Sequence, residues 1–83
     1  MTEQKALEKA RMLMPKAVFV TVTEYKNWFV FGVDAVKSGL MNPVAVDKAS
    51  GKPMVFHPME HDPEAYFKAV KESSRPLSTD FGY

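Results

Sequence analysis

Near the N-terminus, apolar residues recur at helical spacing. Residues 2–14 carry apolar side chains three and four positions apart, from Ala6 to Leu13, and this spacing predicts an amphipathic helix. Thr2 is a favourable N-cap for that helix. Pro15 disfavours helical geometry in the residue before it, so the helix is expected to end there.

The next segments alternate in the way that β-strands do. Residues 17–25 and 28–33 are rich in valine and aromatic side chains, and only two residues separate them. Such a short connection predicts a β-hairpin in which Tyr25 pairs with Trp28 at the turn.

That hairpin separates its side chains into two faces. The pairing places Val22 opposite Phe31 and Val20 opposite Val33. One predicted face is wholly apolar and consists of Val18, Val20, Val22, Phe29, Phe31 and Val33. The other face mixes aromatic residues with threonine and consists of Phe19, Thr21, Thr23, Tyr25, Trp28 and Val30.

A second pair of strands is predicted over residues 43–46 and 54–56. The stretch between them opens with Asp47 and contains Gly51, which is favourable turn chemistry because aspartate bonds nearby backbone and glycine adopts positive φ. Residues 34–42, between the two hairpins, have no clear period and are predicted to be a loop.

The pairing of this second hairpin follows from grouping its apolar side chains. We expect Val46 to pair with Met54 and Val44 with Phe56, which leaves one extra residue for Gly51 to accommodate as a bulge. Pro53 has no N–H to donate, so the last strand is expected at a sheet edge.

The C-terminal third predicts one more helix. Asp62 is a suitable N-cap, Pro63 suits the first helical position, and the apolar stripe continues to Val70. Residues 74–83 lack a period and are predicted to be a tail that is ordered only if Leu77 or Phe81 docks.

The element order predicts an α+β fold. We expect a two-layer α-β-β-β-β-α domain over residues 1–73, with a four-stranded antiparallel meander and both helices on its valine-rich face. Residues 74–83 are the expected tail.

Composition excludes several classes of function. The chain has 83 residues, 46% apolar content, no cysteine and a formal charge of +1. This length suits one domain, and the missing cysteines rule out disulfides and thiolate chemistry. The near-neutral charge argues against nucleic acid as a partner, and no apolar run is long enough to span a membrane. We expect a cytoplasmic protein.

Two histidines are the strongest candidates for chemistry. His57 and His61 are four residues apart and lie beside Glu60, a spacing that would place two imidazoles on one helix face. Pro58 and Pro63 make a continuous helix across this segment improbable, and no third ligand is defined. We therefore expect no metal, no cofactor and no enzymatic activity.

The mixed sheet face is the main candidate binding surface. If both helices cover the valine face, then Phe19, Tyr25, Trp28 and Val30 lack a cover, and aromatic residues of this kind are enriched at protein interfaces. Three occupants are open: the C-terminal tail, a second copy or another protein, or solvent. The acidic segment with Glu60 and Asp62 is a second candidate surface.

Part of this pattern resembles a known family. The carrying segments are 28–31 (WFVF), Gly39, 42–48 (NPVAVDK), 50–52 (SGK) and 63–67 (PEAYF). They resemble the immunity protein 35 family and the YrhB-like proteins, which are small bacterial α+β domains. The resemblance covers roughly residues 6–72.

This resemblance implies a non-enzymatic role, in which the domain binds and neutralises a cognate bacterial toxin. The chain departs from the family pattern at Ser50, where threonine is usual, and at Pro53 inside the last strand. The alternatives are an accessory protein of a phage or mobile element, and a small enzyme or metal-binding protein that uses His57 or His61.

Overall fold

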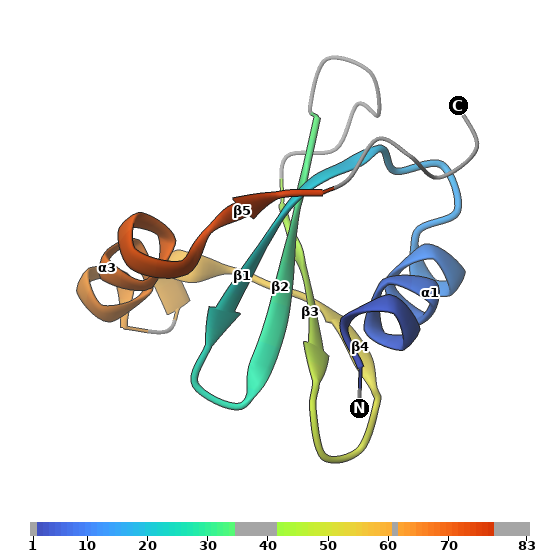
Figure 1. Cartoon of the computed structure of the whole chain (residues 1–83), viewed down its shortest axis with the longest axis horizontal. Coiled ribbons are helices and arrows are strands. Elements are labelled where there is room, and N and C mark those ends of the chain that lie inside the picture. Colours follow the sequence, from blue (N-terminus) through green and yellow to red (C-terminus); the bar gives the residue numbers. More distant parts are fainter. Residues whose placement is uncertain (1, 35–41, 61, 78–83) are drawn as a thin grey trace.

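The computed structural model describes residues 2–34, 42–60 and 62–77. Its elements follow one another along the chain as α1 (Glu3–Leu13), β1 (Phe19–Tyr25), β2 (Trp28–Val33), β3 (Val44–Asp47), β4 (Pro53–Val55), the 3₁₀ turn η1 (Pro58–Glu60), α3 (Pro63–Ser73) and β5 (Arg75–Pro76) (Figure 1). The strands form one antiparallel sheet in the order β4-β3-β2-β1-β5. The α+β class expected from the sequence is confirmed.

Both helices begin as their sequences indicate. The Thr2 hydroxyl accepts a hydrogen bond from the backbone N–H of Lys5 at 3.2 Å. The Asp62 carboxylate accepts one from the N–H of Ala65, also at 3.2 Å, and Pro63 occupies the first turn of α3. Each cap satisfies an N–H that has no partner within its helix.

The first hairpin has the predicted register at its turn and a different one at its far end. Tyr25 pairs with Trp28, and Val22 pairs with Phe31. A bulge between Phe19 and Thr21 then pairs Val33 with Phe19, whereas the alternation predicted Val20. Because a bulge reverses the facing of the residues beyond it, Phe19 enters the core on the same face as Val22, and Val20 is left 40% exposed.

The second hairpin keeps the predicted turn chemistry but not the predicted register. The Asp47 carboxylate accepts hydrogen bonds from the backbone N–H groups of Ala49 and Ser50, and Gly51 has a φ of 74°. Val46 pairs with Pro53, one position away from the expected Met54. The prediction placed a bulge at Gly51. In the structure, β3 and β4 pair without a bulge, and all the residues between them belong to the turn. Met54 consequently faces away from Val46 and is 38% exposed.

A short fifth strand, β5, lies at the other edge of the sheet. Arg75 pairs with Val22 of β1, and the backbone N–H of Leu77 donates to the carbonyl of Val20 at 2.8 Å. Leu77 is buried in the core beside α1. The start of the expected tail is therefore part of the domain, and residues 78–83, including Phe81, lie outside the described residues.

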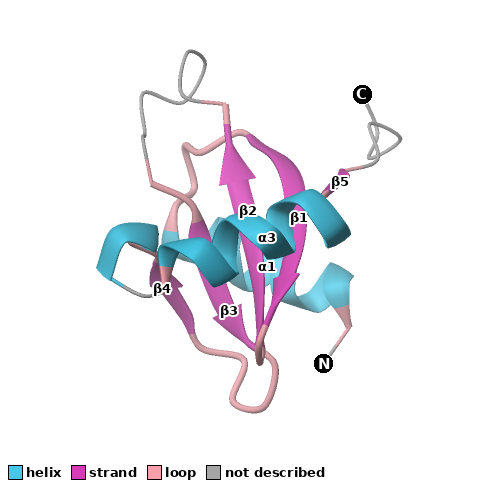
Figure 2. Ribbon diagram, turned by 90° about the vertical axis from the view of Figure 1, so that its left-hand side faces the viewer, coloured by secondary structure: helices cyan, strands magenta, loops and turns pink. Residues whose placement is uncertain are grey.

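The two helices cover opposite faces of the sheet, so the prediction that both lie on one face is wrong. Figures 1 and 2 show α1 and α3 on either side of the strands. The core under α1 contains Ala6, Leu7, Ala10, Phe19, Val22, Phe29, Phe31, Val44, Val46 and Leu77. The core under α3 contains Tyr25, Val30, Ala45, Phe56 and Tyr66. The domain thus has three layers, because both sheet faces are apolar and each needs its own cover.

Candidate functional site

The residues predicted to form an open aromatic face do not form one. Tyr25 and Val30 are 3% and 1% exposed because α3 covers them. Phe19 is buried on the opposite face of the sheet, as the bulge in β1 requires. Trp28 is half-buried at the margin of the α3 core. The premise that this face has no cover in the chain is therefore wrong.

The aromatic side chains beneath α3 pack as a core cluster. The ring of Tyr25 lies 5.5 Å from that of Tyr66 and 5.9 Å from those of Trp28 and Phe56, measured between centroids. These are favourable aromatic contact distances, and the pairs of Tyr25 with Tyr66 and with Phe56 are edge-on. Burial raises the pKa of Tyr66 above its ordinary value, as expected for a phenol withdrawn from water.

The turns of the two hairpins contact each other beside Trp28. The backbone N–H of Lys48 donates to the carbonyl of Asn27 at 2.8 Å. Hydrogen bonds from the backbone N–H groups of Ser50 and Ala49, with a smaller contribution from the Trp28 side chain, lower the pKa of Asp47. Asp47 is thus an ionised acceptor that organises its own turn, and this role accounts for its place in the sequence.

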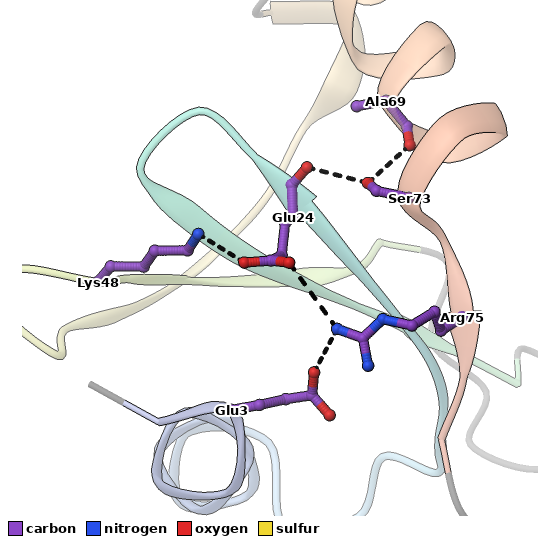
Figure 3. A network of polar contacts seen from close by, with 6 residues as sticks. All are labelled: Glu3, Glu24, Lys48, Ala69, Ser73 and Arg75. Carbon is purple, nitrogen blue, oxygen red and sulfur yellow. Dashed lines mark hydrogen bonds and ion pairs between the residues drawn. The ribbon is translucent and has the colours of Figure 1, made fainter.

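Figure 3 shows a second polar arrangement, which centres on Glu24 of β1. One Glu24 carboxylate oxygen lies 2.8 Å from the Lys48 ammonium group, and the other lies 4.0 Å from the Arg75 guanidinium group. Arg75 also pairs with Glu3 of α1 at 2.5 Å. The hydrogen bond and charge of Lys48, and then the charge of Arg75, lower the pKa of Glu24. The hydrogen bond and charge of Glu3 raise the pKa of Arg75.

The same strand position is also joined to the end of α3. The Ser73 hydroxyl lies 3.1 Å from the backbone carbonyl oxygen of Glu24 and 2.8 Å from that of Ala69, and it can donate its proton to either one (Figure 3). The Glu24 network therefore links α1, β1, the β3–β4 turn, β5 and α3. Its charged members pair with one another, so we interpret the network as a structural connection.

One candidate binding region lies on η1 and the first turns of α3. Met59 is 76% exposed and Phe67 is 52% exposed. Glu60, Asp62 and Glu64 are also exposed. We call these five residues the acidic apolar surface. Glu64 and Phe67 are three residues apart on α3 and are therefore neighbours on its surface.

The acidic apolar surface contains two of the predicted site residues, Glu60 and Asp62. Asp62 also caps α3, so its presence has a structural explanation. Sequence reasoning placed Phe67 in the apolar stripe of the helix. Helical spacing could have excluded Phe67 from the buried face that contains Tyr66. Phe67 directly follows Tyr66, so its side chain points about 100° away from that of Tyr66 around a helix of 3.6 residues per turn.

The histidine-based alternatives gain no support. His57 is exposed, and His61 lies outside the described residues. Within the described part of the chain, no three histidine or acidic side chains gather in a way that could hold a metal ion. Among the helices of those same residues, none is long and apolar enough to cross a membrane.

Comparison with known proteins identifies no relative of this chain. Neither the models of known protein families, nor the curated proteins, nor the solved structures match this chain. The structure therefore defines the class of the domain, α+β, and its function has to be argued from its surfaces.

Proposed function

We propose that this domain is a non-enzymatic protein-binding module whose contact region is the acidic apolar surface. The observation that carries the proposal is the exposure of Met59 and Phe67 among carboxylates. Exposed methionine and phenylalanine supply the apolar area that protein interfaces bury, whereas the surrounding charges select the partner.

The charge of the acidic apolar surface indicates what kind of partner would bind it. From residue 59 to residue 72 the chain has four carboxylates and two lysines, which gives this region a net negative charge. A protein with a basic surface around an apolar contact would complement this region and be steered toward it. A bacterial toxin that acts on nucleic acid has such a basic surface, and neutralising one is the role that the resemblance to immunity proteins implies.

A photo-crosslinking amino acid at position 67 tests the proposal. We expect it to capture a basic protein in the source cells, and the same crosslinker at Val20, another partly exposed apolar position, to capture none. The captured protein is then produced alone, and its affinity for the purified domain is measured by calorimetry.

In the calorimetric experiment, the paired substitutions Met59→Ser and Phe67→Ser should weaken binding at least tenfold. Val20→Ser is the matched control and should leave the affinity unchanged. Binding that survives the paired substitutions, or that is lost equally in the control, would overturn the proposed contact region.

A further inference from the structure

A second exposed surface lies on the opposite side of the sheet, at the end of α1. Met12 is 74% exposed and Leu13 is 40% exposed. Lys9, Arg11 and Lys16 are close to them in the sequence and are also exposed. We call these five residues the basic apolar surface. Lys9 is three residues before Met12 and four before Leu13, so these side chains are neighbours on the helix.

The basic and acidic apolar surfaces have opposite charge and the same kind of apolar contact. Residues 8–16 contain three cations and one carboxylate, whereas residues 59–72 contain four carboxylates and two lysines, so the two segments have net charges of opposite sign. Each surface also presents two large exposed apolar side chains, Met12 with Leu13 and Met59 with Phe67. The end of α1 thus has the chemistry that the acidic apolar surface requires of a partner.

The two surfaces cannot meet within one molecule. The basic apolar surface belongs to α1 and the acidic one to η1 and α3, and the sheet separates these helices (Figure 2). Contact between them therefore requires two copies of the chain. Because unlike patches would meet, the contact is heterologous, and an open oligomer of any length keeps one free surface of each kind at its two ends.

We propose that copies of this domain bind head to tail, with the basic apolar surface of one copy on the acidic apolar surface of the next. This inference rests on the proposed function, since it uses the same acidic apolar surface and identifies its occupant as a second copy. An interface of so few side chains is small, so the association is expected to be weak and to be disrupted by salt.

Sedimentation velocity of the full chain tests the inference. At low salt, the average mass should rise as the protein concentration increases from about 10 µM to about 1 mM, a range that covers weak affinities. Salt at about 0.5 M should reverse that rise. A wild-type protein that stays monomeric over the whole range overturns the inference.

Two variants establish which surfaces meet. One carries Met12→Ser with Leu13→Ser, and the other carries Met59→Ser with Phe67→Ser. Each should be monomeric alone because it lacks one of the two surfaces. An equimolar mixture should form heterodimers, because each variant still supplies the surface that the other has lost. A mixture that remains monomeric, or a variant that associates by itself, contradicts a head-to-tail contact.

A charge-based pair checks that the serine variants do not act through folding. Lys9→Glu with Lys16→Glu, and Glu60→Lys with Glu64→Lys, change only exposed positions. Each should be monomeric alone, and their mixture should associate. Because the two reversed surfaces also complement each other, this mixture should extend beyond a heterodimer. The crosslinker at position 67 separates the two proposals: capture of a different protein by a chain that stays monomeric retains the proposed function and removes self-association. Absence of any capture removes the proposed function.

Discussion

Val30 and Phe31 are adjacent in β2, and their side chains are buried in two different cores. Val30 lies beneath α3 in the cluster with Tyr66, and Phe31 lies beneath α1 in the cluster with Leu7. Successive side chains of a strand point to opposite faces, so a strand that is apolar at both positions has to be covered on both sides. The stability of this small domain is therefore divided between two cores, each of which depends on one helix.

The α3 core should be sensitive to loss of Tyr66. Tyr66→Ala removes a ring that contacts Tyr25 and Phe56 with centroid distances of 5.5 and 5.1 Å. We expect the free energy of unfolding to fall by about 3 kcal/mol, the usual scale for truncating a buried aromatic residue. Urea denaturation followed by the fluorescence of Trp28, the single tryptophan, measures this loss.

The next residue provides a matched control. Phe67 is also aromatic and on α3, but it is 52% exposed. Phe67→Ala should cost less than about 1 kcal/mol, because exposed side chains contribute little to folding. Equal costs for the two variants would contradict the orientation of α3 on the sheet.

Removing the hydroxyl group of Tyr25 should not destabilise the domain, in contrast to truncating Tyr66. It is buried and has no hydrogen-bond partner in the part of the chain that the structure describes. Burying an unpaired hydroxyl is unfavourable, so Tyr25→Phe should keep the free energy of unfolding or raise it by up to about 1 kcal/mol. Chemical denaturation measures the change. A loss of more than about 1 kcal/mol would show that the hydroxyl makes a stabilising hydrogen bond in solution.

Local signals in the sequence predicted the elements and turns well. Thr2 and Asp62 cap their helices, and Tyr25 pairs with Trp28 across a two-residue turn. Asp47 binds its own backbone. Each of these features depends on residues close together in the chain, where the backbone geometry leaves few alternatives.

Long-range features could not be predicted in the same way. The bulge beside Thr21 changes which side chains enter each core, and alternation alone does not show it. The side of the sheet that α3 covers depends on how Tyr66 packs against residues far away in the sequence. The prediction that the aromatic face lacks a cover was wrong for this reason, since burial of Tyr25 and Val30 is a property of the tertiary structure.

Because Glu24 forms ion pairs, the free energy of unfolding should depend on pH. Lys48 and Arg75 lower the pKa of Glu24 in the folded protein below the ordinary value of 4.5. The ionised form therefore favours folding at pH values above 4.5, and this contribution is lost as the pH falls through the lowered pKa. Because Glu24 is half-exposed, its pairs should contribute less than about 1 kcal/mol.

Glu24→Gln measures this contribution. The variant should be less stable than the wild type near neutral pH, and the difference should shrink on acidification, when the wild-type carboxylate is also uncharged. Thermal unfolding at several pH values follows the difference. Glu8→Gln, at an exposed position of α1, is the control for general charge effects. An equal effect in both variants would indicate a general charge effect.

Lys26 occupies an unfavourable backbone conformation at the turn of the first hairpin. Its φ is 52°, a region that costs an L-residue other than glycine about 1 kcal/mol. Lys26→Gly removes that cost but increases the entropy of the unfolded chain and loses the contact of the Lys26 ammonium group with the Tyr25 ring at 5.2 Å. We expect a net gain of up to about 0.5 kcal/mol in unfolding free energy. A loss would show that the contact with Tyr25 outweighs the strain.

Gly51 is the converse case, because its φ of 74° already suits glycine. Gly51→Ala should lower the free energy of unfolding by about 1–2 kcal/mol, since L-alanine is strained in this region. The D-enantiomer of alanine, introduced by chemical synthesis, favours positive φ and carries its methyl group in place of the other α-hydrogen. If backbone geometry alone is responsible, D-alanine should retain the stability of the wild type or increase it. Equal destabilisation by both enantiomers would instead mean that strain of the L-residue at positive φ does not explain the loss.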